Sequence, residues 1–238
     1  SAVNMNVPAC RPDDATSVKP QEEQATNYPH RLLEDVKVLA SFKGWEEEVY
    51  KDFFRLQRGE MSEADFRRKY QRERAILSMD LTGFVRSAIQ HGDLHSLLRI
   101  LDVQKLAIPV LHDFGSDLVR CFADDIVALF EEPGAAVDAA FEVHRRMRLF
   151  NESSLASKDP PWCCVGIGFG RVLAIGPNLA QGDEMNRASK LGEDIARGNE
   201  TLVTETVYSA IAHREDIDFE LRDEDDLLFP FYRIAPKT

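Results

Sequence analysis

The segment from residue 118 to residue 130 restricts the possible folds more than any other part of this sequence. It holds two apolar runs, Leu118–Phe122 and Ile126–Phe130, separated only by Ala123, Asp124 and Asp125. A short acidic turn between two apolar runs is typical of a β-hairpin, whose strands are antiparallel neighbours. A doubly wound sheet built from parallel strands is therefore not expected.

The flanking segments add further strands and helices in a mixed order. Strands are expected at 75–81, 201–205 and 229–234, and as a strand pair over 163–175. Helices are expected from about residue 93, from 133, over 184–197 and over 206–213, and Pro109 should bend or end the first of them. Helices mixed with hairpins predict an α+β fold.

The N-terminal third has a different character. Residues 1–28 are polar and rich in Pro, which predicts a disordered N-terminal segment. Residues 29–74 are highly charged and carry apolar residues at helical spacing, which predicts a helical extension of two or three short helices. The third predicted segment, 75–238, is the main domain, and a length of 238 residues suits one domain with an appendage.

Composition excludes several classes of protein. The net charge of −12 argues against a protein that coats nucleic acid, so no nucleic-acid partner is expected. No apolar run is long enough to cross a membrane and no export signal is visible, so we expect a cytoplasmic protein without a membrane partner. The four cysteines form no CxxC pair, so a zinc site is not expected and the thiols should be reduced or part of the core.

Two carboxylates stand at positions suited to chemistry. Asp80 ends the first predicted strand and Asp124 lies in the hairpin turn, so both meet at one sheet edge if the hairpin lies beside that strand. Two carboxylates with nearby main-chain carbonyls suit Mg²⁺ or Mn²⁺, and the main-chain N–H groups of 82–84 could hold a phosphate. The alternative is that Asp80 caps a turn and Asp124 only fills the hairpin.

Three other features have a structural and a functional interpretation. Asn186 and Lys190 share a helix face, where an amide and a cation can stabilise a transferring phosphoryl group, or where they form an ordinary solvated surface. The glycines of 166–170 do not have dinucleotide-binding spacing and favour a role in sheet packing or a bulge. We interpret His144, on an apolar helix face, as a packed histidine.

Three segments in order, 80–84, 122–130 and 182–191, resemble the catalytic domain of class III nucleotidyl cyclases. The resemblance covers roughly residues 73–235 and implies a ferredoxin-like α+β fold and an antiparallel homodimer with two sites at its interface. It implies that Asp80, Asp124 and the carbonyl of Leu81 bind two Mn²⁺ or Mg²⁺ ions, and that a nucleoside triphosphate is the substrate. Phosphate-cradling residues are then Thr82, Gly83 and Phe84. From the other subunit, Asn186 would orient the ribose and Lys190 would stabilise the transition state.

The sequence departs from the family pattern at the positions that recognise the base of the nucleotide. Arg120 and Leu179 occupy the two base-recognising positions, and they match neither the adenylate nor the guanylate cyclase residues. Lys190 stands where the family usually has Arg, and Ala123 where it has Gly. The chain is more similar to stand-alone bacterial pyrimidine cyclases of anti-phage, Pycsar-type systems. That similarity implies uridylate cyclase activity on UTP, with a cyclic UMP messenger that activates a separate effector.

Three alternatives stay open at this point. One is an adenylate or guanylate cyclase, and a second is a catalytically dead nucleotide-binding scaffold of the same fold. The third, a polymerase palm domain, is disfavoured by the acidic charge.

Overall fold

The computed structural model describes residues 31–153, 159–175, 180–222 and 229–237. The chain divides into two units, 1–34 and 35–238, and of the first only 31–34 are described, without helix or strand. The predicted disordered segment 1–28 lies outside the described residues. The helices of the second unit are α1 (Val36–Ser41), α2 (Glu47–Gln57), α3 (Glu63–Tyr70), α4 (Phe84–His91), α5 (Asp93–Asp113), α6 (Pro133–Glu152), α7 (Asp183–Ser189), the π-helix η1 (Lys190–Ile195) and α8 (Glu205–Ile211). The strands are β1 (Gln71–Leu81), β2 (Leu118–Phe122), β3 (Asp125–Phe130), β4 (Cys163–Ala174), β5 (Ala180–Gln181), β6 (Thr201–Thr204), β7 (Ile217–Arg222) and β8 (Phe231–Pro236).

The described strands form one sheet in the order β2-β3-β1-β4-β6-β8-β7, with β5 paired to β4. β2 and β3 form the predicted hairpin, and β3 runs antiparallel to β1 with Met79 opposite Ile126. Only the β4–β6 pair among these strands is parallel. The α+β prediction is confirmed, and the hairpin lies beside the first strand, as the carboxylate hypothesis requires.

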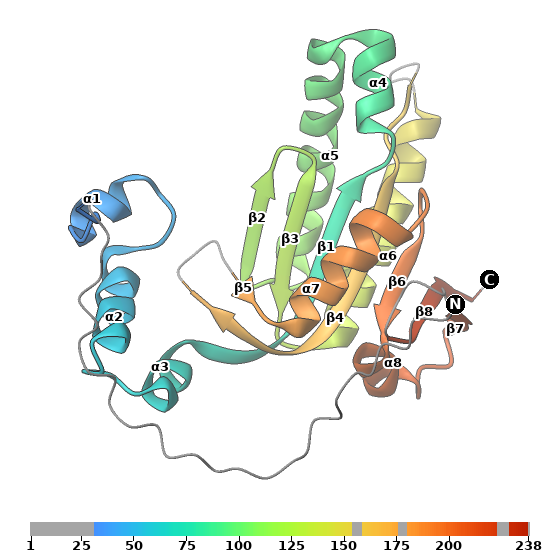
Figure 1. The fold of residues 1–238 in the computed structure, drawn as a ribbon. Helices are drawn as coiled ribbons and strands as arrows, with labels where there is room; N and C mark the ends of the chain where they lie inside the picture. The colour runs from blue at the N-terminus through green and yellow to red at the C-terminus, as the bar shows by residue number, and fades with distance from the viewer. Residues whose placement is uncertain (1–30, 154–158, 176–179, 223–228, 238) are drawn as a thin grey trace, which may run out of the picture. The chain divides into compact units, whose positions relative to one another are not determined.

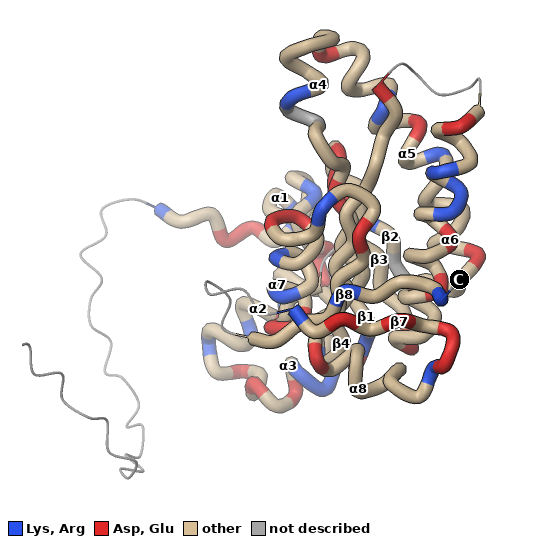
Figure 2. Tube along the Cα trace, turned by 90° about the vertical axis from the view of Figure 1, so that its right-hand side faces the viewer, with Lys and Arg blue, Asp and Glu red and all other residues tan. Residues whose placement is uncertain are grey.

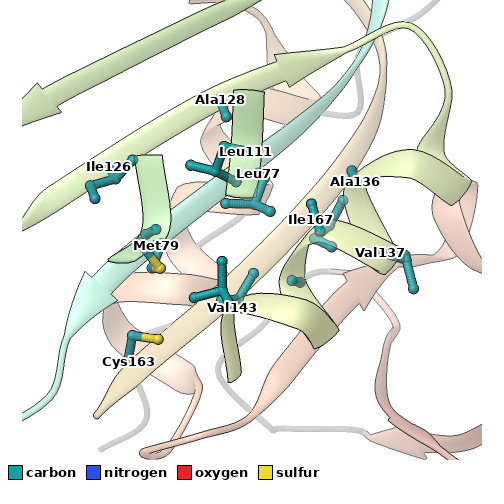
Figure 3. Close-up of a cluster of buried hydrophobic side chains, with 14 of the residues drawn as sticks. Leu77, Met79, Leu111, Ile126, Ala128, Ala136, Val137, Val143, Cys163 and Ile167 are labelled. Atoms are coloured by element: carbon teal, nitrogen blue, oxygen red, sulfur yellow. The ribbon is translucent and has the colours of Figure 1, made fainter. Parts of the chain in front are cut away.

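The two faces of the sheet are covered by different helices. Along β1, alternate residues from Ala75 to Leu81 enter the main core with α5 and α6, because strand side chains point alternately to opposite faces. Figure 3 shows Leu77 and Met79 of this core beside Leu111 of α5 and Val143 of α6. On the other face, residues of α7 share a second buried cluster with Ile76, and Figure 1 shows α7 across the sheet from α5 and α6. The sheet is therefore the middle layer of three.

Helices α1 to α3 precede the sheet and confirm the expected short helices. Val49 of α2 and Phe66 and Tyr70 of α3 form a small core, which Ile175, just after β4, completes. Ser62 caps α3 by accepting a hydrogen bond from the main-chain N–H of Asp65. The strand that follows begins at Gln71, so the prediction that the helical stretch continues to residue 74 is wrong at its last residues.

Several elements differ from the sequence expectations. α5 continues through Pro109 to Asp113, because Pro109 removes one exposed helical hydrogen bond while its neighbours Ala107, Val110 and Leu111 are buried. α4 was not expected, and 163–174 is one continuous strand rather than a pair. β7 was also missed.

No described helix is long and apolar enough to span a membrane. Lys and Arg segments are interspersed with Asp and Glu segments along the described chain (Figure 2).

Candidate active site

Asp80 and Asp124 come together because of strand pairing. Asp80 is the penultimate residue of β1, and Asp124 lies in the turn that joins β2 to β3. Since β3 pairs with β1, the end of β1 and the hairpin turn lie at the same edge of the sheet. Both carboxylates line one cavity of about 570 Å³, together with Leu81, Gly83, Arg86, Ile89 and Gln90.

Three carboxylates in and around this cavity have raised pKa values. Burial, followed by the charges of Asp124, Asp125 and Glu193, raises the pKa of Asp80 to about 6, although a main-chain hydrogen bond at Leu81 opposes the rise. Burial also raises the pKa of Asp125 and of Glu193, each helped by a neighbouring aspartate. Burial is thus the largest cause of the rise at each of these three carboxylates, and the neighbouring carboxylates add to it.

The donor set fits a divalent ion that is held jointly with a phosphate. Among the described residues, no group of three or more His, Cys, Asp or Glu side chains is placed to enclose a metal ion. Mg²⁺, however, commonly binds through one or two carboxylates together with substrate phosphates rather than within a protein cage. Asp80, Asp124 and the Leu81 carbonyl are thus the residues that would hold such an ion.

Two residues near this cavity were missed by sequence reasoning. Arg86 comes from the first turn of α4, the helix that the sequence analysis did not predict. Glu193 comes from η1, where its carboxylate lies 3.5 Å from the Ser78 hydroxyl. Recognising Gly83 as the start of a helix would have pointed to Arg86, but Glu193 reaches the site only through long-range packing.

The predicted phosphate cradle is only partly available. The main-chain N–H of Thr82 donates to the carbonyl of Trp162 at 2.8 Å, so this group already has a hydrogen-bond partner within the chain. Gly83 has a φ of 73°, a left-handed conformation that favours glycine, and precedes the first residue of α4. The first N–H groups of a helix lack intrahelical partners, which leaves those of Gly83 and Phe84 as candidates. The side chain of Phe84 lies outside what the structure describes.

Asn186 and Lys190 do not line the cavity of their own chain. Asn186 is exposed on α7, and Lys190 is the first residue of η1. The Lys190 Nζ lies 2.5 Å from Asp194 Oδ2, so its charge is paired within the chain. The cavity lined by Asp80 and Asp124 therefore contains neither the Asn186 amide nor the Lys190 cation, which the sequence suggested for the same reaction.

Arg120 occupies a separate depression. It lies on β2 and lines a cavity of about 480 Å³ with Val119, Cys121, Phe122 and Asp125. Its charge opposes the rise in the pKa of Asp125. Leu179, the other predicted base-contacting residue, lies outside the described residues.

The remaining candidates have structural roles, as predicted. His144 is buried and lies 3.0 Å from the Thr201 hydroxyl, and burial is the main reason that its pKa is lowered to about 4. Cys163 and Cys164 are free thiols on opposite sheet faces, one in the main core and one against the Ala196 carbonyl. The glycines of β4 serve close packing, because a Cβ on Gly166 would lie 2.1 Å from the Ala188 carbonyl oxygen.

The comparisons with known proteins support the same fold. The sequence matches no protein-family model and no curated protein. Solved structures do match, among them the adenylyl cyclase CyaB from P. aeruginosa, with a TM-score of 0.60 and 15% identity over 71% of this chain and 96% of that chain. An adenylate/guanylate cyclase/hydrolase from Silicibacter pomeroyi matches with a TM-score of 0.58 and 23% identity over 71% and 99%.

A third match is the guanylate cyclase domain of RhGC from Catenaria anguillulae in complex with GTP, with a TM-score of 0.57 and 13% identity over 71% of this chain and 99% of that chain. Sequence identities this low support a shared fold and do not establish a shared activity. The chain has the α+β fold of class III adenylate/guanylate cyclase catalytic domains.

Proposed function

We propose that this protein is a nucleotidyl cyclase that converts a nucleoside triphosphate into a 3′,5′-cyclic nucleotide and pyrophosphate. One observation carries the proposal: Asp80 and Asp124 line the same cavity at one sheet edge of a cyclase fold. The surroundings of Asp80 support it: burial is the main cause of its raised pKa, the charges of Asp124, Asp125 and Glu193 add to the rise, and a divalent cation would offset those charges.

In this reaction the 3′-oxygen of the ribose attacks the α-phosphorus, and the bond to the leaving pyrophosphate breaks. Asp80, Asp124 and the Leu81 carbonyl would hold two divalent ions, Mn²⁺ or Mg²⁺. Bound there, such ions would make the attacking oxygen more nucleophilic and would neutralise charge on the leaving pyrophosphate. Arg86 faces the same cavity and is positioned to pair with phosphate oxygens. The Gly83 and Phe84 N–H groups complete the phosphate cradle.

The active form is a homodimer with two composite sites. Asn186 and Lys190 do not line the cavity of their own chain, so a second copy must supply them. Asn186 of that copy orients the ribose, and Lys190 stabilises charge on the transferring phosphoryl group. Lys190 must leave Asp194 to do so. The cost of this exchange is small, because both side chains are about half exposed, at 48% and 56%, and exposed ion pairs are weak.

The favoured substrate is UTP. Arg120 offers five donors and no acceptor, which suits the O2 and O4 acceptors of uracil and not the exocyclic amine of adenine. Guanine competes through its O6 and N7, but Leu179 offers no acceptor for the donors of guanine, and each unpaired donor costs about 1–3 kcal/mol. The expected order is UTP, CTP, GTP and ATP. Cyclic UMP then acts as a messenger that activates a separate effector in anti-phage defence.

Product analysis tests the substrate. The full chain is incubated with equal amounts of the four nucleoside triphosphates and Mn²⁺, and the products are identified by mass. Cyclic UMP should dominate, and Arg120→Ala should raise the KM for UTP without changing Mn²⁺ binding. If cyclic AMP or cyclic GMP dominates, the pyrimidine assignment is wrong although the cyclase assignment stands.

A catalytically dead nucleotide-binding scaffold is the second candidate. The pairing of Lys190 with Asp194 favours it, because the cation expected to act in catalysis already has a partner. Such a scaffold would bind a nucleotide and release no pyrophosphate with any of the four substrates.

A further inference from the structure

One buried carboxylate has no place in the chemistry described above. Glu184 lies in the first turn of α7 and is only 8% exposed. Its Oε2 accepts hydrogen bonds from the main-chain N–H of Phe169 at 3.1 Å, the Thr204 hydroxyl at 2.7 Å and the Thr206 hydroxyl at 2.8 Å. Its Oε1 lies 3.1 Å from Arg187 Nη1. One side chain thus joins α7 to β4, to the end of β6 and to the start of α8.

The glycines of β4, which have no Cβ, leave room for this side chain. A Cβ on Gly168 would lie 2.5 Å from the main-chain oxygen of Glu184 and 3.1 Å from its Oε2. A Cβ on Gly170 would lie 2.9 Å from its Cγ. The glycines of β4 therefore leave the space that Glu184 fills. We call the residues around its side chain the Glu184 socket: Gly168, Phe169, Gly170, Thr204 and Thr206.

The socket fixes the helix that carries the reacting side chains. Asn186 follows Glu184 by two residues, and Lys190 follows it by six. Arg187, the fourth contact of Glu184, also stacks over the Phe229 ring at 5.0 Å, which ties the same turn to the segment before β8. Because α7 is short, a shift or rotation of its first turn moves both Asn186 and Lys190.

We propose that Glu184 is a positioning residue, which sets the placement of Asn186 and Lys190 through the socket. This inference rests on the proposed function for its catalytic consequence. The claim that the socket orders α7 does not rest on the proposed function, because the four contacts of Glu184 hold α7 in place whatever the protein catalyses. A carboxylate that only added to overall stability would leave kcat unchanged in a variant that remains folded.

The kinetic test uses Glu184→Gln in the full chain with Mn²⁺ and UTP. The amide places an NH₂ group against either Arg187 or the hydroxyls, so α7 shifts. We expect kcat to fall about ten- to a hundredfold, the loss expected for a misplaced catalytic group, while the KM for UTP and the affinity for Mn²⁺ stay within about twofold. Glu205→Gln, an exposed carboxylate on neighbouring α8, is the matched control and should leave all three unchanged.

A second pair of variants approaches the socket from the strand. Gly170→Ala inserts a methyl group against Glu184 and should lower kcat in the same way, without removing any charge. Gly134→Ala, where a Cβ would meet nothing within 4 Å, is its control. Gly170→Ala also decides the question if Glu184→Gln does not fold. An unchanged kcat in a folded socket variant, or a loss of kcat matched by a loss of Mn²⁺ affinity, overturns the inference.

Hydrogen exchange separates this inference from the proposed function. Amides of α7 and η1 should exchange faster in Glu184→Gln and Gly170→Ala than in the parent chain, while those of α5 stay unchanged. If the parent chain has no cyclase activity, the proposed function fails, and hydrogen exchange alone tests whether the socket orders α7. Unchanged exchange over α7 and η1 in the variants then shows that the socket does not order α7.

Discussion

At the scale of single residues, the hairpin turn contains a strained alanine. Ala123 has a φ of 53°, in the left-handed region where a Cβ costs about 1–2 kcal/mol. Ala123→Gly should relieve this strain, less the greater entropy that glycine loses on folding, and stabilise the protein by about 0.5–1 kcal/mol. Urea denaturation measures the change. Ala64→Gly, on the exposed face of α3, should instead lower stability by about 1 kcal/mol. A loss of stability at both positions would contradict the assignment of strain to Ala123.

His144 gives the protein a dependence of stability on pH. Its pKa is lowered to about 4 by burial, then by the charge of Arg148, against an ordinary value of 6.5. The unfolded chain therefore binds a proton between pH 6.5 and 4 that the folded chain does not, so stability falls as the pH falls through this window. The contribution of His144 is a loss of about 1.4 kcal/mol per pH unit. Denaturation of His144→Gln and the parent at several pH values should show a shallower fall in the variant, and parallel curves would refute the assignment.

At the scale of elements, some parts were predictable from sequence and others were not. The hairpin was predictable because its turn and apolar runs are local signals. The alternation Ile217-Asp-Phe-Glu-Leu-Arg222 is a period-two strand pattern that could have revealed β7. The continuation of α5 through Pro109 could not be foreseen, because tertiary packing outweighs the local penalty. Asp80 and Asp124 could be placed together from order and pairing, whereas Glu184 and Glu193 depend on how α7 and η1 pack on the sheet.

A buried carboxylate, which we call the polar anchor, joins α2 to α3 ahead of the sheet. Asp52 of α2 is 3% exposed and accepts hydrogen bonds from Lys69 at 2.6 Å, Tyr70 at 2.9 Å and Arg55 at 3.1 Å. Asp52→Ala leaves the Lys69 and Tyr70 donors without this acceptor and should cost about 1–3 kcal/mol. Thermal denaturation and hydrogen exchange over α2 and α3 measure the effect. Glu47→Ala, which removes an exposed pair with Lys51, should change neither. Equal effects of the two variants would show that Asp52 is not the anchor.

At the scale of the whole molecule, the proposed sites are shared between two copies. Asp80→Ala and Asn186→Ala chains should each be inactive alone. After subunit exchange, one site per heterodimer is intact, so up to a quarter of the parent activity should return when equal amounts are mixed and pair at random. Labelled subunits verify that exchange has occurred. Failure to recover activity in proven heterodimers would mean that each site is built within one chain.

The proposed function depends most on Asp80 and Asp124, which we propose to hold the metal ions of a nucleotidyl cyclase. Pyrophosphate release with Mn²⁺ and the preferred nucleoside triphosphate tests it most directly, in Asp80→Ala, Asp124→Ala and the neighbouring control Asp125→Ala. Circular dichroism verifies that the variants are folded. Each removed ligand leaves the ions poorly held, so the first two variants should lose at least about a hundredfold in rate, while Asp125→Ala loses much less. Near-parental release of pyrophosphate by folded Asp80→Ala or Asp124→Ala would rule out the proposed metal-binding role of these two carboxylates.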